Sequence, residues 1–250
     1  MNQTLIEKLK MLAEKYETKA FIKEDPSRFL WWYNDKENAE IASFIAAMLS
    51  FGNRKQFIPK IEFILNIADC SGGINNWIKS GNFQKDFLPK NKTESQKFYR
   101  FYSYKDLLNL FLALQQIICK CGSFEQLVYN EYKKSPQKNI IDILSEIFAD
   151  CAIVPKGKSS AKKRLCMFAR WMVRSNSCVD RGFWSWVPMK DLIIPLDVHV
   201  LEESIKFGLL PPESKPTRKT AELLTEQLKQ IWPEDPVKGD YALFGPGVNN

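Results

Sequence analysis

The sequence has few of the side chains that hold metal ions. It contains one histidine and six scattered cysteines, and it has no Cys-x-x-Cys pair. Structural zinc sites and iron–sulfur clusters draw on closely spaced cysteine and histidine ligands. We therefore expect no metal and no cofactor, and the plain interpretation of the cysteines is reduced thiols in a cytoplasmic protein.

Long apolar runs are also missing. A helix that spans a bilayer needs roughly 18 or more consecutive apolar residues, and the longest apolar runs here are far shorter. The first four residues, Met-Asn-Gln-Thr, lead directly into an amphipathic pattern and do not have the form of a signal peptide. These features predict no membrane span and a cytoplasmic location.

No stretch shows the sustained alternation of apolar and polar residues that is typical of half-buried strands. Apolar residues recur instead at the spacing of a helix. The clearest such stretches are residues 5–16, 41–49, 61–68, 140–148 and 165–173, and residues 106–121 are apolar on nearly every side. The sequence therefore predicts an all-α protein.

Helix starts are predicted at three further places. Thr4 begins a Thr-x-x-Glu run that has the pattern of a capping box. Asp25 precedes a proline, and this pair is typical of an N-cap followed by the first helical residue. Ser159 or Ser160 is expected to cap the helix over residues 165–173.

The length and apolar content allow one large core or two small ones. The chain has 250 residues, of which 45% are apolar, and single cores begin to divide near this size. We expect one all-helical domain, residues 1–250, built as two lobes. Lobe A comprises residues 1–37 and 150–250, lobe B comprises residues 38–149, and the protein is expected to be a monomer.

Positive charge is concentrated in one segment. Seven Lys and Arg residues and no acidic residue lie between Cys151 and Val179, and this excess equals the formal net charge of the whole chain, +7. Within a helix, Lys163, Arg170 and Arg174 share one face because they lie two and three turns apart. A row of cations near a helix start suits phosphate groups. Nucleic-acid contact is one interpretation of this face, and a solvated charged face is the other.

A second candidate feature is the run Pro-Leu-Asp-Val-His-Val at residues 195–200. Asp197 comes directly before an apolar pattern that ends at Gly208, which predicts an N-cap, and a purely capping role is its simplest interpretation. The same backbone N–H bonds would keep the carboxylate ionised in a semi-buried place. A carboxylate held in that way can stabilise positive charge that develops on a sugar. His199 is more simply a surface or packing residue than a catalyst.

These blocks resemble the helix-hairpin-helix (HhH-GPD) DNA glycosylase superfamily. Leu-Asp-Val-His-Val at residues 196–200 is similar to the turn that carries the catalytic aspartate there, with Val198 in the place of a threonine. Lys163 matches the catalytic lysine, and Lys162 is a near competitor. Weaker similarities lie at residues 47–50 and 241–245. Over nearly its whole length the chain resembles more closely an uncharacterised bacterial family of conserved hypothetical proteins.

The resemblance implies a two-lobed glycosylase fold with a cleft between the lobes, and duplex DNA as the partner. The implied activity is base-excision-repair N-glycosylase chemistry on a flipped damaged base, with or without strand cleavage at the resulting abasic site. Lys163 would attack C1′ as a neutral amine, and Asp197 would stabilise the oxocarbenium-like transition state or orient the nucleophile.

Six side chains are expected to contact DNA by this resemblance. A glutamine commonly wedges into the duplex where this chain has Gly52, so a neighbouring side chain would have to substitute for it. The expected contacts are Asn53, Arg54, Lys158, Lys162, Arg170 and Arg174. The aromatic residues near the basic segment either hold the extruded base or belong to the core, and these are Trp171, Phe183, Trp184 and Trp186.

Two departures from the superfamily favour an alternative function. The hairpin run Val-Pro-Lys-Gly-Lys at residues 154–158 keeps one glycine and shifts it, and Lys163 lies 34 residues before Asp197, a wider interval than in common members. The alternative is a non-catalytic nucleic-acid-binding protein on a degenerate glycosylase scaffold. A third interpretation is a helical interaction protein whose basic face serves solubility alone.

Overall fold

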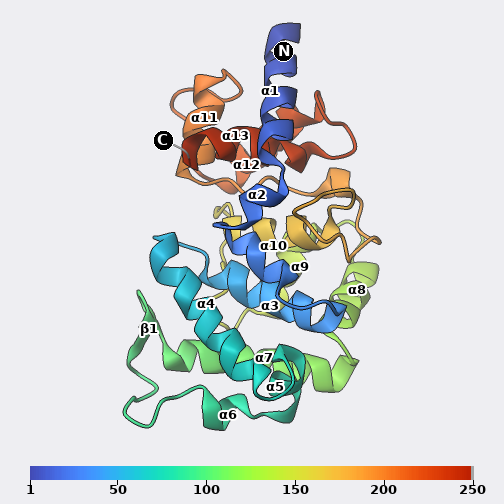
Figure 1. Cartoon of the computed structure of the whole chain (residues 1–250). Coiled ribbons are helices and arrows are strands. Elements are labelled where there is room, and N and C mark those ends of the chain that lie inside the picture. The colour runs from blue at the N-terminus through green and yellow to red at the C-terminus, as the bar shows by residue number, and fades with distance from the viewer. Residues whose placement is uncertain (249–250) are drawn as a thin grey trace. The chain divides into compact units, whose positions relative to one another are not determined.

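The computed structural model describes residues 1–248, and this part of the chain is mostly helical (Figure 1). The described strands, β1 (Lys97–Tyr99) and β2 (Tyr102–Ser103), form one short antiparallel hairpin. The prediction of a mainly helical protein is confirmed.

The described chain divides into two compact units, each discontinuous in sequence. The first unit comprises Met1–Lys23, Asn139–Ile141 and the chain from Pro155 onward. The second comprises Glu24–Lys138 and Asp142–Val154, so that residues 24–37 belong with the second unit.

The helices of the first unit come mainly from the two ends of the chain. They are α1 (Gln3–Tyr16), α2 (Lys19–Ile22), α10 (Lys163–Val173), η2 (Met189–Asp191), α11 (Val198–Lys206), α12 (Arg218–Lys229), η3 (Pro236–Lys238) and α13 (Gly239–Val248). Both α1 and α11 pack against α13. The side chains of Tyr241, Ala242 and Leu243 on α13 are buried there, which makes this helix the centre of the unit.

The second unit holds the middle of the chain. Its elements are η1 (Pro26–Trp31), α3 (Lys36–Leu49), α4 (Arg54–Asp69), α5 (Ile74–Ser80), α6 (Phe83–Asp86), the β1–β2 hairpin, α7 (Tyr104–Cys121) and α8 (Phe124–Lys134). The helix α9 (Ile140–Ile147) begins in the first unit and continues into the second.

The core of the second unit forms around α3, where every residue from Ala39 to Leu49 is buried. Phe44 of this helix contacts the rings of Phe124 and Phe148, with ring centroids 5.0 and 4.6 Å away. Apolar burial of this extent is the main term that stabilises a helical unit.

The long apolar helix predicted over residues 106–121 is α7, and it begins slightly earlier than expected. Ser103 and Asp106 form a reciprocal capping box at its start. Within the described residues no single helix combines the length and apolarity of a bilayer span, and only α7 together with α8, bent by 75° at the break between them, meets that test by length and composition.

Candidate functional site

Lys163 and Asp197, 34 residues apart in the sequence, meet in the first unit. Asp197 is the N-cap of α11, and its Oδ1 atom accepts a hydrogen bond from the backbone N–H of Val200 at 2.9 Å. Its Oδ2 atom lies 2.5 Å from the Nζ atom of Lys163. The predicted cap therefore exists, and it uses one carboxylate oxygen while the other oxygen holds the amine.

The amine is held at the start of α10, where Lys163 is the first helical residue. Lys162 precedes it with a left-handed backbone, φ 48°, which turns the chain into the helix. The ring of Phe244, on α13, lies 5.5 Å below the Nζ atom of Lys163. Three elements thus fix the position of this amine.

The pair is partly open to solvent. The side chains of Lys163 and Asp197 keep 31% and 19% of their exposure, and Val198 and His199 beside them are exposed. Burial raises the pKa of Asp197, but the charge and hydrogen bond of Lys163 outweigh it, so that the pKa lies below its usual value. Asp197 is therefore a carboxylate at neutral pH, in reach of an external ligand.

The prediction that Arg170 contacts DNA phosphate is wrong because this side chain is buried, with 4% exposure. Its guanidinium contacts the carboxylate of Asp240, lies 3.4 Å from that of Asp180, and stacks 4.6 Å from the ring of Tyr241. Burial disfavours its charge, yet the carboxylate of Asp180 outweighs this and raises the pKa of Arg170.

The same correction applies to Arg174, which is 2% exposed. Its guanidinium bonds to Glu17 at 2.8 Å, to Asp180 at 2.7 Å and to Asp235 at 2.9 Å. Arg170, Arg174 and these carboxylates form one buried network, defined by Glu17, Arg170, Arg174, Asp180, Asp235 and Asp240. Two of the three cations of the expected basic face, Arg170 and Arg174, therefore point into the unit instead of towards a nucleic acid.

The other expected DNA contacts lie in different places. Lys162 is buried, with 8% exposure, so a phosphate contact by this lysine is also wrong. Lys158 is exposed in the segment before α10. Asn53 is exposed at the N-cap of α4 in the second unit, and Arg54 beside it forms an ion pair with Asp25 at 3.3 Å.

Of the aromatic residues considered for base binding, Trp171 and Trp184 are fully buried, so their interpretation as core residues is correct. Trp184 stacks on Trp186 with ring centroids 5.6 Å apart. Trp186 and Phe183 are half-buried.

Asp240, which was not among the expected site residues, lies on α13 one turn before Phe244. Burial raises the pKa of Asp240 to about 6, with Arg170 and Lys163 opposing this shift and the charges of Asp197 and Asp180 adding to it. The charge of Asp240 is thereby coupled to the candidate pair. The sequence signals were the similarity of residues 241–245 to a late superfamily helix and that of residues 240–245 to the uncharacterised bacterial family.

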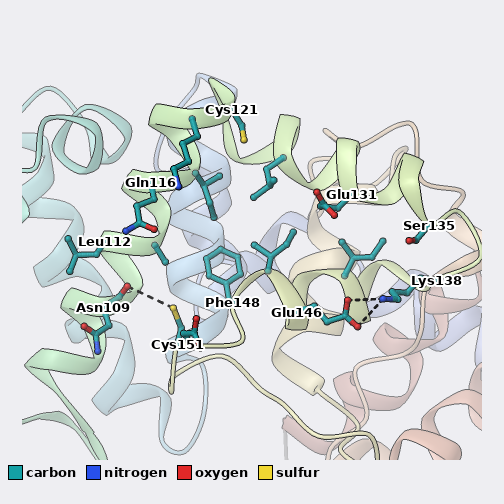
Figure 2. Close-up of a pocket in the computed structure, with 17 residues that line it drawn as sticks. Asn109, Leu112, Gln116, Cys121, Glu131, Ser135, Lys138, Glu146, Phe148 and Cys151 are labelled. Carbon is teal, nitrogen blue, oxygen red and sulfur yellow. Dashed lines mark hydrogen bonds and ion pairs between the residues drawn. The ribbon is translucent and has the colours of Figure 1, made fainter.

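The second unit has a cavity of about 790 Å³ between α7, α8 and α9 (Figure 2). Phe148 lines its middle, and Lys138 and Glu146 form an ion pair at 2.7 Å at one end. The thiol of Cys151 lies 3.9 Å from the carbonyl oxygen of Asn109. The cavity can accept an apolar group, and its Lys138–Glu146 pair is more exposed, at 37% and 63%, than the Lys163–Asp197 pair.

No group of three or more His, Cys, Asp or Glu side chains placed to hold a metal ion occurs among the described residues.

Comparison with known proteins identifies a family for nearly the whole chain. Residues 25–249 match the model of the family described as "Protein of unknown function (DUF2400)". The chain belongs to that family, which agrees with the predicted resemblance to an uncharacterised family. No curated protein and no solved structure matches the chain.

Proposed function

We propose that this member of the DUF2400 family is a DNA N-glycosylase with lyase activity, on a two-lobed helix-hairpin-helix glycosylase fold. The single observation that supports it is the contact between the Lys163 amine and the Asp197 carboxylate, at 2.5 Å and partly exposed. A nucleophile in contact with a base is the arrangement that covalent catalysis requires.

In the proposed reaction, the ammonium of Lys163 gives a proton to water while Asp197 stays a carboxylate and orients the amine, and the neutral amine attacks C1′ of a flipped nucleotide. The bond from Nζ to C1′ forms while the bond from C1′ to the base breaks. The base leaves with the bonding electrons and takes a proton from water. The attached nitrogen then passes one proton to O4′ while its lone pair breaks the bond from C1′ to O4′, so that the ring opens and an iminium links Lys163 to the sugar.

Asp197 has a second role in this proposal. Its pKa lies below the usual value, so it carries negative charge while the sugar develops positive charge. A fixed charge of opposite sign near the reacting atom typically changes the rate by about 10²–10³-fold. Lys158, Asn53 and Arg54 remain the proposed contacts to the DNA backbone.

Borohydride reduction tests the proposal, because it converts the iminium into a stable covalent complex. We expect trapping with a duplex that carries an abasic site and with at least one member of a panel of damaged bases. Lys163→Gln abolishes trapping, and Asp197→Asn slows it by about 10²-fold. Lys206→Gln is the matched control, since this exposed lysine of the first unit pairs with Glu203 and is not among the proposed DNA contacts.

A second function is favoured by the ion pair itself, since a lysine held as an ammonium by a carboxylate serves a structural role without chemistry. A non-catalytic nucleic-acid-binding protein would bind DNA equally well with Lys163→Gln and would show no trapping on any duplex. If no duplex is trapped, and if Lys163→Gln and Asp197→Asn bind DNA as the wild type does, the second function is correct.

A further inference from the structure

A compact surface of the second unit combines exposed cations with an exposed aromatic ring. It is formed by the turn before α4, residues 50–55, and by the β1–β2 hairpin with its tip at Arg100 and Phe101. We call it the hairpin surface. The ring of Phe51 joins its two parts, lying 5.0 Å from the ring of Tyr99 and 5.1 Å from that of Phe101.

The charge of the hairpin surface has one sign. Residues 50–60 and 97–105 contain six cations and no Asp or Glu; the cations are Arg54, Lys55, Lys60, Lys97, Arg100 and Lys105. Arg54 is paired with the buried Asp25, but Lys55, Lys97 and Arg100 are exposed. This is the charge that a phosphate backbone complements.

The ring of Phe101 is presented to solvent and held from beneath. It is 59% exposed. Its inner side contacts Phe51 and also Tyr102, whose ring centroid is 4.5 Å away and whose side chain is only 7% exposed. The Nζ atom of Lys97 donates to the carbonyl oxygen of Phe101 at 2.9 Å and fixes the hairpin tip. A ring supported in this way loses little conformational entropy when a flat partner stacks on it.

Gly52 makes room for Arg100 on this surface. Its φ is +80°, and a Cβ atom at this position would lie 2.5 Å from Nη1 of Arg100 and 2.9 Å from the hydroxyl oxygen of Tyr99. Arg100 itself has a left-handed backbone, φ 50°, which is uncommon for a residue with a side chain. The guanidinium lies 6.0 Å from the ring of Phe51. Two unusual backbone positions together therefore place one cation beside the aromatic rings.

We infer that the hairpin surface binds nucleic acid at an unpaired base, which stacks on Phe101 while Arg100, Lys97 and Lys55 contact the adjoining phosphates. Aromatic rings that stack on successive bases within a basic groove are the usual means of binding unpaired strands. The inference deepens the proposed function, on which it rests for its partner, by naming the surface and the form of nucleic acid it prefers.

A nucleic acid suits the hairpin surface better than a protein or a lipid bilayer does. Phe101 is the exposed large apolar side chain within residues 50–60 and 97–105. One ring offers too little apolar area for a stable protein interface or for insertion into a membrane. One ring is sufficient for one base, and the surrounding cations supply the remaining affinity.

Fluorescence anisotropy with labelled oligonucleotides tests the inference. The probes are one 15-nucleotide DNA strand, the RNA strand of the same sequence, its fully paired DNA duplex, and that duplex with a single-base bulge. We expect the wild-type protein to bind the strand and the bulged duplex at least fivefold more tightly than the paired duplex. The RNA probe shows whether the surface distinguishes the two sugars.

Substitutions separate stacking from charge. Phe101→Ala and Phe101→Leu each weaken binding of the unpaired probes by about tenfold, while Phe101→Trp retains it, because leucine is apolar but has no flat π-face. Arg100→Gln lowers the slope of log Kd against log salt concentration by about 0.7 on the single strand. Trp31→Ala is the matched control, since Trp31 is 46% exposed in the same unit. Thermal melting of each variant establishes that it is folded.

The outcomes distinguish the two proposals. Unchanged binding in Phe101→Ala, or wild-type binding in Phe101→Leu, overturns the stacking role of the hairpin surface even when borohydride trapping succeeds. Trapping that fails while Phe101→Ala still loses affinity overturns the catalytic proposal and supports the hairpin surface. Absence of binding to all four probes overturns the inference.

Discussion

At the scale of single residues, local composition is a poor guide to whether a charge is paired. The segment around α10 contains no acidic residue, and yet Arg174 bonds to carboxylates 61 and 157 residues away in the sequence, Asp235 and Glu17. Removing one member of a buried ion pair leaves an uncompensated charge and typically costs about 3–5 kcal/mol. The network is therefore a structural element of the first unit.

Arg174→Met should lower the free energy of unfolding by about 3–5 kcal/mol, because Asp180 and Glu17 lose their shared partner inside the unit. Urea denaturation followed by circular dichroism measures the change. Lys158→Met is the control, since substitution of an exposed side chain changes stability by less than about 0.5 kcal/mol. Equal stabilities of the two variants would contradict the buried network.

Asp240 should make stability depend on pH between about 4 and 6. Burial raises its folded-state pKa to about 6, above the roughly 3.9 of an unfolded chain. Its contribution to the unfolding free energy is therefore fully present below about pH 4 and is lost as the pH rises through 6. The loss is on the order of 3 kcal/mol for a shift of this size.

Urea denaturation of wild type and Asp240→Asn at several pH values between 4 and 7.5 checks this prediction. The groups that face Asp240 are Arg170, Lys163, Asp197 and Asp180, and all remain in the variant. The expected result is a difference between the two profiles that changes across pH 4 to 6. Parallel profiles would show that Asp240 ionises as an ordinary surface carboxylate does.

The sequence was sufficient to identify the two residues of the candidate pair, but it did not predict which side chains surround them. Lys163 and Asp197 were identified because each matches a local motif, and their contact follows once the chain folds. Arg170 and Arg174 were assigned to the wrong role because most of their partners, Glu17, Asp235 and Asp240, come from distant parts of the sequence. No spacing within one segment carries that information.

At the scale of elements, helix starts were predictable where the cap is local. Asp25 caps η1 and Asp197 caps α11, as expected. Thr4 does not begin α1, because Asn2 provides the cap two residues earlier. Ser160 does not cap α10, because this residue forms a bridge with Thr217, which comes from a distant segment. Tertiary pairing overrides local propensity at that position.

Two glycines of the first unit allow the cost of backbone strain to be measured apart from the cost of a steric clash. Gly157 and Gly182 both have positive φ, +90° and +60°. A Cβ atom on Gly157 meets nothing within 4 Å, whereas one on Gly182 lies 2.8 Å from the carbonyl oxygen of Arg174 and 2.9 Å from the Cα atom of Ser175. Backbone atoms cannot move aside as a flexible side chain can.

We therefore expect Gly157→Ala to lower the unfolding free energy by about 1 kcal/mol, from conformation alone. Gly182→Ala should cost at least about 1 kcal/mol more, because the segment that carries Arg174 must also shift. Thermal unfolding of the two variants under one buffer condition measures the difference. Similar melting temperatures would show that residues 174–182 tolerate such a shift.

At the scale of the whole molecule, the net charge of +7 has a different distribution from the one the sequence indicated. Three of the seven cations between Cys151 and Val179, namely Lys162, Arg170 and Arg174, are buried, which leaves four. In the second unit, residues 50–60 and 97–105, which include the hairpin surface, contain six cations in two short segments. The two segments lie far apart in the sequence and each has only three cations, so the sequence did not indicate a second basic region.

Salt dependence should show which of these charges contact DNA. Each phosphate contact adds about 0.9 to the slope of log Kd against log salt concentration on a duplex. Lys158→Gln, which removes an exposed cation before α10, should lower that slope by about this amount, whatever the DNA sequence. Anisotropy titrations between 50 and 200 mM salt, roughly the range over which the effect is large, measure it.

Lys229→Gln is the control for that experiment, because the Nζ atom of Lys229 lies 2.6 Å from the carboxylate of Glu226 on the same helix. A cation that is already neutralised releases no counterion when DNA binds, so the slope should equal that of the wild type. An unchanged slope in Lys158→Gln would mean that the segment before α10 does not contact the duplex. The proposed glycosylase would then have to hold its substrate through other cations, such as those of the hairpin surface.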